Sequence, residues 1–203
     1  MVKDGYRFAL PALALGAIGF LLGWHGLGFL FFLMGAFVVY FFRDPERIPP
    51  SDPNAVVSPA DGRVTKVVRE PLDGRPGLRI SIFLAIWNVH VNRSPMGGRV
   101  VSVDYRRGKF YNAMRARASE DNEQNVIRLQ TDRGEIVFKQ IAGAIARRVV
   151  CWKRPGDALN AGERIGLIRF GSRMDVWLPE GAEPVAKVGD HVAGGESVLA
   201  RWQ

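Results

Sequence analysis

A glycine followed by a serine, Gly171-Ser172, lies between two apolar runs that have the pattern of β-strands. A serine hydroxyl attacks a neighbouring carbonyl carbon when a base removes its proton. Glycine before the serine eases the strained backbone that an attack on the chain itself requires. The pair therefore predicts either an ordinary turn or a site at which the chain cuts itself and acquires a carbonyl group at position 172.

Two distant residues carry the groups that would activate this serine. His90 stands in an apolar run flanked by polar residues, and Asp61 stands in a Pro-Ala-Asp-Gly turn. Such an Asp orients the His, and the His deprotonates the Ser. The alternatives are a core position for His90 and a turn-capping role for Asp61. The hydrolase elbow Gly-x-Ser-x-Gly is absent, because Arg173 and Met174 follow the serine, so an outside ester or peptide is disfavoured as the substrate.

Short apolar runs separated by Gly, Pro and Asp-Gly pairs predict a mainly β domain (α+β) that starts near residue 55. The expected strands cover residues 56–57, 64–68, 78–83, 100–105, 126–129, 136–138 and 149–152. The polar stretch 113–123 interrupts them and is expected to form a helical turn or a mobile loop.

Two segments of this domain, 57–64 and 185–198, resemble the halves of a biotinyl/lipoyl-type hybrid barrel. Because such halves pair across a long sequence separation, we expect the C-terminal segment to dock beside residues 57–68. That pairing would bring Ser172 and Asp61 into one neighbourhood.

The N-terminal part is strongly hydrophobic, with no Lys, Arg, Asp or Glu from Phe8 to Phe42. This stretch is too long for one membrane span of about 20 residues and slightly short for two. A turn is expected at residues 23–26, and basic residues on both sides place both ends on the cytoplasmic side. We therefore expect residues 1–42 to form a hairpin of two short spans, with shallow insertion or a cleaved signal peptide as alternatives, followed by a Pro-rich linker, 43–54.

The net charge of +8 predicts a negatively charged partner. The chain has no helix-turn-helix, zinc-finger or RNA-binding aromatic motif, and the hydrophobic N-terminal part favours membrane lipid over nucleic acid. Cys151 is the only cysteine, which excludes an internal disulfide and a multi-cysteine metal site. No metal site is expected.

A set of motifs spread over the chain resembles the phosphatidylserine decarboxylase proenzymes of the short, membrane-anchored bacterial or archaeal type. The motifs cover residues 41–47, 57–64, 89–95, 108–113, 122–125 and 170–175. Longer members of that family carry Leu-Gly-Ser-Thr at the junction and often a second histidine. This chain has Phe-Gly-Ser-Arg, and His90 stands alone, which leaves open whether His90 serves cleavage, decarboxylation or both.

The resemblance implies a pyruvoyl-dependent enzyme. His90, held by Asp61, would help Ser172 to attack the Gly171 carbonyl, giving a large chain, 1–171, and a small chain, 172–203, that begins with a pyruvoyl group. This cofactor would accept electrons during the decarboxylation of phosphatidylserine to phosphatidylethanolamine. The soluble domain would lie on the cytoplasmic face of the inner cell membrane. Archaetidylserine is the alternative substrate.

Several polar and aromatic residues are candidates for contact with the lipid headgroup, and each is alternatively an ordinary surface or core residue. The cations that could bind the phosphate or carboxylate are Lys109, Arg93 and Arg115. The amides that could bind other polar atoms are Asn112, Asn122 and Asn125. The aromatic rings that could line the pocket are Phe83 and Trp87.

Three other classes of protein predict a chain that is never cut. A non-catalytic hybrid-motif carrier needs a lysine at a hairpin tip, and the sequence does not offer one there. A metallopeptidase needs a His-x-His pair, whereas the sequence has His90-Val-Asn92. A basic domain that binds anionic lipid without chemistry is the third class. Assembly into a homo-oligomer is left open by the sequence.

Overall fold

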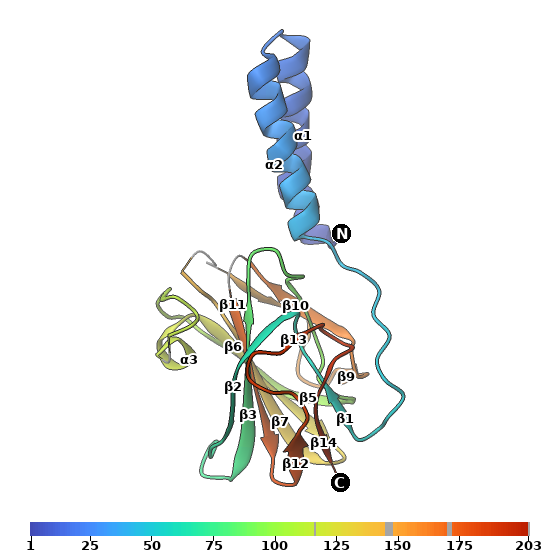
Figure 1. Cartoon of the computed structure of the whole chain (residues 1–203), viewed down its shortest axis with the longest axis vertical. Coiled ribbons are helices and arrows are strands. Elements are labelled where there is room, and N and C mark those ends of the chain that lie inside the picture. Colours follow the sequence, from blue (N-terminus) through green and yellow to red (C-terminus); the bar gives the residue numbers. More distant parts are fainter. Residues whose placement is uncertain (116, 145–147, 170–171, 203) are drawn as a thin grey trace. The chain divides into compact units, whose positions relative to one another are not determined.

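The computed structural model describes residues 1–115, 117–144, 148–169 and 172–202. The chain divides into two compact units, residues 1–46 and 47–203 (Figure 1). The first unit is a pair of helices, and the second contains the strands. The predicted mainly β domain preceded by a helical hairpin is therefore confirmed.

The N-terminal unit consists of α1 (Lys3–Leu21) and α2 (His25–Phe41), joined by a tight turn. Gly23 in this turn has a φ of +79°, a conformation that glycine adopts without the strain a side chain would cause. The two helices approach closely, because a Cβ atom on Gly19 would lie 3.0 Å from the backbone of Gly28. The predicted hairpin and the place of its turn are confirmed.

The expectation of two short membrane spans is wrong. In the described ranges, no helix is both long enough and apolar enough to cross a membrane. The helix α1 has 19 residues, but its first turns carry Lys3, Asp4 and Arg7. The 17 residues of α2 rise only about 25 Å, against a hydrocarbon thickness of about 30 Å.

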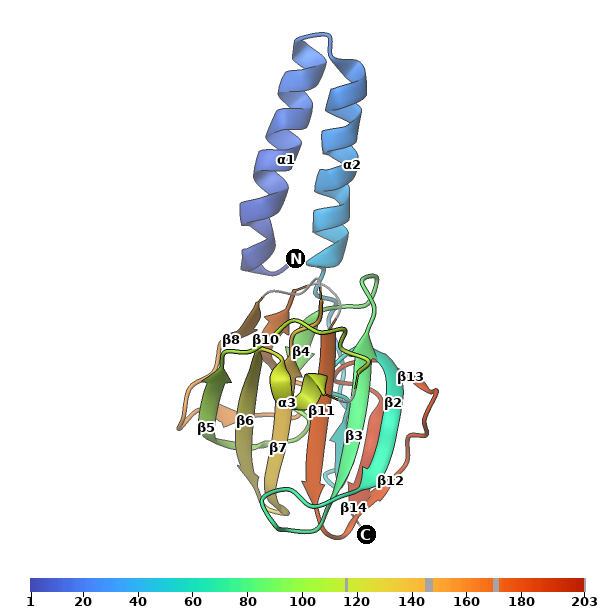
Figure 2. The ribbon, with the colours of Figure 1, turned by 90° about the vertical axis from the view of Figure 1, so that its left-hand side faces the viewer.

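Antiparallel strand pairs build the second unit, and in the described ranges they form three sheets (Figure 2). The large sheet has the order β13 (His191–Val192), β2 (Gly62–Arg69), β3 (Gly77–Leu84), β11 (Ser172–Pro179), β7 (Gly134–Ile141), β6 (Gln124–Thr131), β5 (Gly98–Arg106), β9 (Ala158–Leu159). The two smaller sheets are β1 (Ala55–Val57), β14 (Val198–Trp202), β12 (Ala182–Pro184) and β4 (Val91–Arg93), β10 (Arg164–Ile168), β8 (Val149–Cys151).

One hydrophobic core lies between the large sheet and the two smaller ones. Along β3, every second residue from Leu78 to Leu84 is fully buried in it, as the period of two in a strand requires. The smaller sheets contribute residues such as Leu199 and Ile165. The opposite face of the large sheet is partly covered by the segment 107–123, whose short helix α3 (Ala118–Asp121) lies across the sheet near β7 and β11 (Figure 2).

The C-terminal segment docks where the sequence analysis predicted. Val198 pairs with Val57, and Val192 pairs with Gly62, so the end of the chain lies along β1 and the start of β2. The Ser58 amide donates to the Ser197 carbonyl, 2.8 Å away, and extends the contact through the turn. The hybrid-barrel interpretation of these segments stays a prediction.

Candidate active site

The strand register brings the ends of neighbouring strands to one edge of the large sheet. Ser172, the first residue of β11, pairs with Leu84, the last residue of β3. On its other side, Arg173 pairs with the end of β7, which pairs with the start of β6 and through it with Arg106 at the end of β5. We call this row the Ser172 edge. The described part of β11 begins at this edge with Ser172, the residue after the predicted cleavage junction.

Ser172 is fully buried, and its side chain lies on the same face of β11 as the core residues Met174 and Val176. Its Oγ atom has no hydrogen-bond partner within the described part of the chain. A buried hydroxyl without a hydrogen-bond partner lowers the stability of the folded chain by about 1–3 kcal/mol. Gly171, which supplies the carbonyl for the predicted cleavage, lies outside the described residues. The structure therefore offers a buried, unengaged hydroxyl at the predicted nucleophile.

His90 is buried in the connection between β3 and β4, and its ring orientation is set by the main chain. The Nδ1 atom lies 2.9 Å from the carbonyl oxygen of Asn88. A carbonyl oxygen only accepts, so Nδ1 carries the proton and donates it, and the neutral ring has its basic lone pair on Nε2. The Asn88 side chain in turn accepts from the Ala85 amide at 2.8 Å, which closes the turn before His90.

Two short connections link the same pair of strand ends and carry His90 and Ser172. The first runs from Leu84, which pairs with Ser172, to His90, whose carbonyl accepts from the Ile168 amide at 3.2 Å. The second runs from Ile168 to Ser172. His90 therefore lies in a connection that leaves the Ser172 edge, and its carbonyl bonds to Ile168, the last residue of β10. The joint action of His90 and Ser172 stays a prediction.

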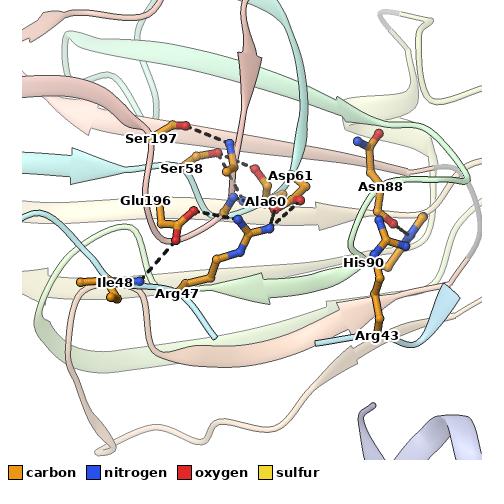
Figure 3. Close-up of polar contacts among 12 residues, drawn as sticks. Arg43, Arg47, Ile48, Ser58, Ala60, Asp61, Asn88, His90, Glu196 and Ser197 are labelled. Atoms are coloured by element: carbon orange, nitrogen blue, oxygen red, sulfur yellow. Dashed lines mark hydrogen bonds and ion pairs between the residues drawn. The ribbon is translucent and has the colours of Figure 1, made fainter. Parts of the chain in front are cut away.

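Asp61 does not make the hydrogen bond to His90 that the sequence analysis predicted. Its Oδ1 accepts from the Gly194 amide at 2.7 Å, and its Oδ2 lies 2.9 Å from Nη2 of Arg47. Figure 3 shows Asp61 and His90 in separate groups of contacts. The physical reason is that Asp61 lies in the turn that faces the C-terminal segment, whereas the His90 ring bonds to the Asn88 carbonyl.

Arg47 connects three separate parts of the chain. Besides Asp61, it binds Glu196 through Nη1 at 2.7 Å, so the linker, the turn before β2 and the C-terminal segment meet at one guanidinium group (Figure 3). Side-chain hydrogen bonding to Arg47 lowers the pKa of Glu196. Sequence reasoning assigned no site role to Arg47. The available signal was its place at the end of the motif 41–47.

Three of the predicted substrate-binding residues use their polar groups inside the protein. The Asn122 amide exchanges two hydrogen bonds with the backbone of Tyr111 and donates a third to the Ala142 carbonyl. The Asn125 amide donates to the Gln140 side chain at 2.9 Å. Arg93 is buried and donates to the Gly162 carbonyl at 3.1 Å. These contacts give each residue a structural role, and binding of substrate by them stays a prediction.

Lys109 and Asn112 lie exposed on the segment that leaves the Ser172 edge after β5. Hydrogen bonding to the Tyr111 side chain, with a further contribution from the charge of Asp121, raises the pKa of Lys109, so the ammonium group stays charged. The side chain of Asn112 accepts from the Met114 amide at 3.0 Å. Phe83 is half-buried and pairs with Arg173 across β3 and β11.

The residue after the predicted nucleophile, Arg173, holds this same segment against the sheet. Its Nη1 donates to the carbonyls of Ala113 and Arg115, and its Nε lies 3.0 Å from Oδ1 of the fully buried Asp175. The Ser119 hydroxyl donates to the other Asp175 oxygen at 2.6 Å. Burial lowers the pKa of Arg173, and the charge of Asp175 opposes this shift. Sequence reasoning missed this contact, although Arg173 is the residue at which the junction departs from the Gly-Ser-Thr of longer relatives.

Cys151 is a poor candidate for a nucleophile, because burial raises the pKa of its thiol. Its Sγ lies 3.7 Å from the Lys153 carbonyl oxygen. Within the described ranges, no group of His, Cys, Asp and Glu residues is arranged to hold a metal ion.

Comparison with known proteins relates this geometry to one family. The model of the family described as phosphatidylserine decarboxylase matches residues 34–200. A phosphatidylserine decarboxylase proenzyme of Pelobacter propionicus is 49% identical over 180 residues, covering 87% of this chain and 82% of the relative. Another, of Ruegeria pomeroyi, is 45% identical over 214 residues, covering 100% of this chain and 95% of the relative. The chain therefore belongs to the phosphatidylserine decarboxylase family.

Proposed function

We propose that this chain is a proenzyme that cuts itself before Ser172 and then decarboxylates phosphatidylserine to phosphatidylethanolamine and carbon dioxide. The observation that carries the proposal is the buried Ser172 hydroxyl at the Ser172 edge, in a member of this family. Its partner is His90, whose ring is fixed with the basic nitrogen at Nε2.

The cleavage needs a base and a nucleophile that the chain itself supplies. His90 Nε2 takes the proton of the Ser172 hydroxyl, and Oγ attacks the carbonyl carbon of Gly171. The peptide C–N bond breaks, so the chain is joined at this point by an ester, and the Ser172 nitrogen becomes a free amine. Removal of the Ser172 α-proton then expels the Gly171 carboxylate together with Oγ. The dehydroalanine that remains at position 172 rearranges to an imine. Water hydrolyses this imine, which releases ammonia and leaves a pyruvoyl group at position 172.

The surroundings of Ser172 fit this conversion. Its hydroxyl is buried without a partner in the described part of the chain, and the cleavage removes that group from the core. When present, the pyruvoyl group supplies an electron-accepting carbonyl for the loss of carbon dioxide from an amine-bearing substrate. We assign to His90 the return of a proton to the substrate carbon, because histidine is the side chain that most often transfers protons in catalysis.

Headgroup binding is assigned to the exposed residues of the segment after β5. Lys109 keeps its charge and is suited to a phosphate, and the amide of Asn112 lies three residues along the same segment. We propose that the N-terminal hairpin inserts shallowly into the inner cell membrane, with the decarboxylase domain on the cytoplasmic face. Support comes from the exposed apolar side chains of the hairpin, such as Leu21 and Leu30, and from Lys3 and Arg7 near its start.

The test is intact-mass analysis of the expressed protein, with an assay of carbon dioxide release from phosphatidylserine. We expect two chains divided between Gly171 and Ser172, the smaller lacking a free amino terminus. Ser172→Ala should leave a single chain and abolish the release of carbon dioxide. Ser94→Ala is a matched control, because this buried hydroxyl bonds to the Met96 carbonyl instead of lying at the junction. A single full-length chain with decarboxylase activity would contradict the proposal.

A further inference from the structure

Apolar and basic side chains gather on the loops that leave the Ser172 edge. Most of them belong to the segment 105–117, and one stands in the turn after β3. The exposed apolar members are Trp87, Tyr105, Phe110 and Met114, and the exposed cations are Arg106, Arg107, Lys109, Arg115 and Arg117. We call this set the edge patch.

The register explains why these residues share one end of the domain. Trp87 follows the end of β3 at Leu84, and the segment 105–117 contains the last residues of β5 and continues beyond Arg106. Both strand ends belong to the row of paired residues that contains Ser172. The edge patch therefore lies at the same end of the large sheet as Ser172.

The edge patch is held in place and yet turned outward. Arg173 fixes the backbone of the segment through the carbonyls of Ala113 and Arg115. Between these two residues, the side chain of Met114 remains 65% exposed, and Trp87 is also 65% exposed. Exposed apolar side chains cost free energy in water, and their grouping on one end of a domain marks an interaction surface.

The positive charge of the edge patch favours a negatively charged partner. Residues 105–117 contain five cations and no acidic residue. Of the acidic residues that follow, Glu120, Asp121 and Glu123, the last has its side chain hydrogen-bonded to Tyr105. Apolar side chains mixed with Lys and Arg fit the interface of an anionic bilayer, where the former enter the headgroup region and the latter meet lipid phosphates and carboxylates.

We propose that the edge patch docks on the surface of a bilayer that contains anionic phosphatidylserine, and so turns the Ser172 end of the domain toward its substrate. This inference rests on the proposed action at a membrane, and adds a second membrane contact that is independent of the hairpin. Arg173, which follows Ser172 in β11, thereby connects the start of this strand to the docking surface.

The first test places a polarity-sensitive dye on the full chain. Met114→Cys and, as a matched control at the opposite edge of the sheet, Asp132→Cys are made in a Cys151→Ser background. With vesicles of phosphatidylcholine and phosphatidylserine, the dye at position 114 should shift to the blue and be quenched by bromine-labelled acyl chains, whereas the dye at position 132 should not. Equal responses, or none at position 114 while the protein is bound to the vesicles, would overturn the proposal.

The second test separates docking from headgroup binding. The double variant Arg107→Gln, Arg117→Gln should raise the KM for phosphatidylserine in vesicles by about fivefold per cation removed. Its kcat and its KM for a soluble, short-chain phosphatidylserine should stay unchanged. Arg154→Gln, an exposed cation near the start of β5, is the control. An equal rise with the soluble substrate would assign the cations to the headgroup site and contradict the docking surface. A wild-type protein that docks on the vesicles but releases no carbon dioxide would instead contradict the proposed function.

Discussion

The hydrogen bond from His90 to the Asn88 carbonyl gives the imidazole the orientation that the sequence analysis had assigned to Asp61. A backbone carbonyl orients the imidazole and fixes its tautomer as well as a carboxylate would, without adding a charge beside the ring. Asp61 is engaged with Arg47 and the Gly194 amide. Its influence on cleavage should therefore pass through the position of the C-terminal segment.

A change of Asp61 to Asn should slow self-cleavage without moving its pH midpoint. The variant keeps an acceptor for the Gly194 amide but loses the negative charge that faces Arg47, while the bond between His90 and Asn88 is untouched. The measurement is the half-time of cleavage across the neutral pH range. Asp190→Asn, which alters a carboxylate in a neighbouring exposed turn, is the control. A shifted midpoint for the Asp61 variant alone would show that Asp61 acts directly on His90.

Replacing Arg47 with Met should destabilise the domain by about 1–3 kcal/mol, less than the 3–5 kcal/mol typical of a fully buried pair, because the Arg47 and Asp61 side chains retain 15% and 16% exposure. The free energy of unfolding is measured by chemical denaturation in a Ser172→Ala background, in which the chain is expected to stay whole.

The control for Arg47 is another arginine of the same domain. Arg201→Met removes an ion pair with Asp52 in which the side chains are 53% and 34% exposed, and it should cost at most about 1 kcal/mol of stability. Equal losses of unfolding free energy in the two variants would mean that the contact of Arg47 with Asp61 and Glu196 stabilises the domain no more than an ion pair at the surface.

At the scale of elements, Arg173 connects the start of β11 to the segment that carries the edge patch. Asp175 is fully buried, so Arg173→Met would leave an unpaired charge in the sheet, at a cost of about 3–5 kcal/mol. It would also release the carbonyls of Ala113 and Arg115. We expect trypsin to cut faster within residues 106–117, as followed by mass spectrometry.

A double variant separates these two effects of Arg173. Arg173→Met combined with Asp175→Asn removes the unpaired charge, so it should recover much of the stability while trypsin still cuts the segment rapidly. Arg69→Met, which loses an exposed ion pair with Glu183, is the control and should change neither property. Recovery of trypsin resistance in the double variant would show that other contacts hold the segment.

At the scale of the whole molecule, the predicted small chain supplies strands to two of the three sheets in the described ranges. Its strand β11 lies between β3 and β7 (Figure 2), and β14 lies between β1 and β12. Removing it would expose both neighbours of a central strand. Cleavage therefore should not divide the folded domain.

The two chains should stay together under native conditions and separate only in denaturant. Native mass spectrometry should give the mass of one complete chain, near 22.5 kDa, or a whole-number multiple if the protein is a homo-oligomer. Denaturing chromatography should then resolve residues 1–171 from the small chain. Loss of the small chain during native gel filtration would contradict the interleaved topology.

Much of the fold could be predicted because its signals are local. The alternation of apolar residues fixed β3 and its neighbours to within a few residues, and the uncharged stretch with a central glycine fixed the hairpin. The two membrane spans were wrong because the pattern gave the length of the whole stretch, whereas the turn and the polar first turns of α1 divide it into helices that are too short or too polar.

The sequence by itself determined the family, and it supplied the predicted junction at Gly171-Ser172 and the candidate base His90, because these depend on residue types and motif spacing. Only the tertiary structure decided which groups touch. Arg47 reaches Glu196 across 149 positions, and Arg173 reaches Ala113 across 60. Such contacts depend on strand register and on loop closure between distant segments, and a cation at one position gives no sign of the carbonyl or carboxylate that the fold will bring to it.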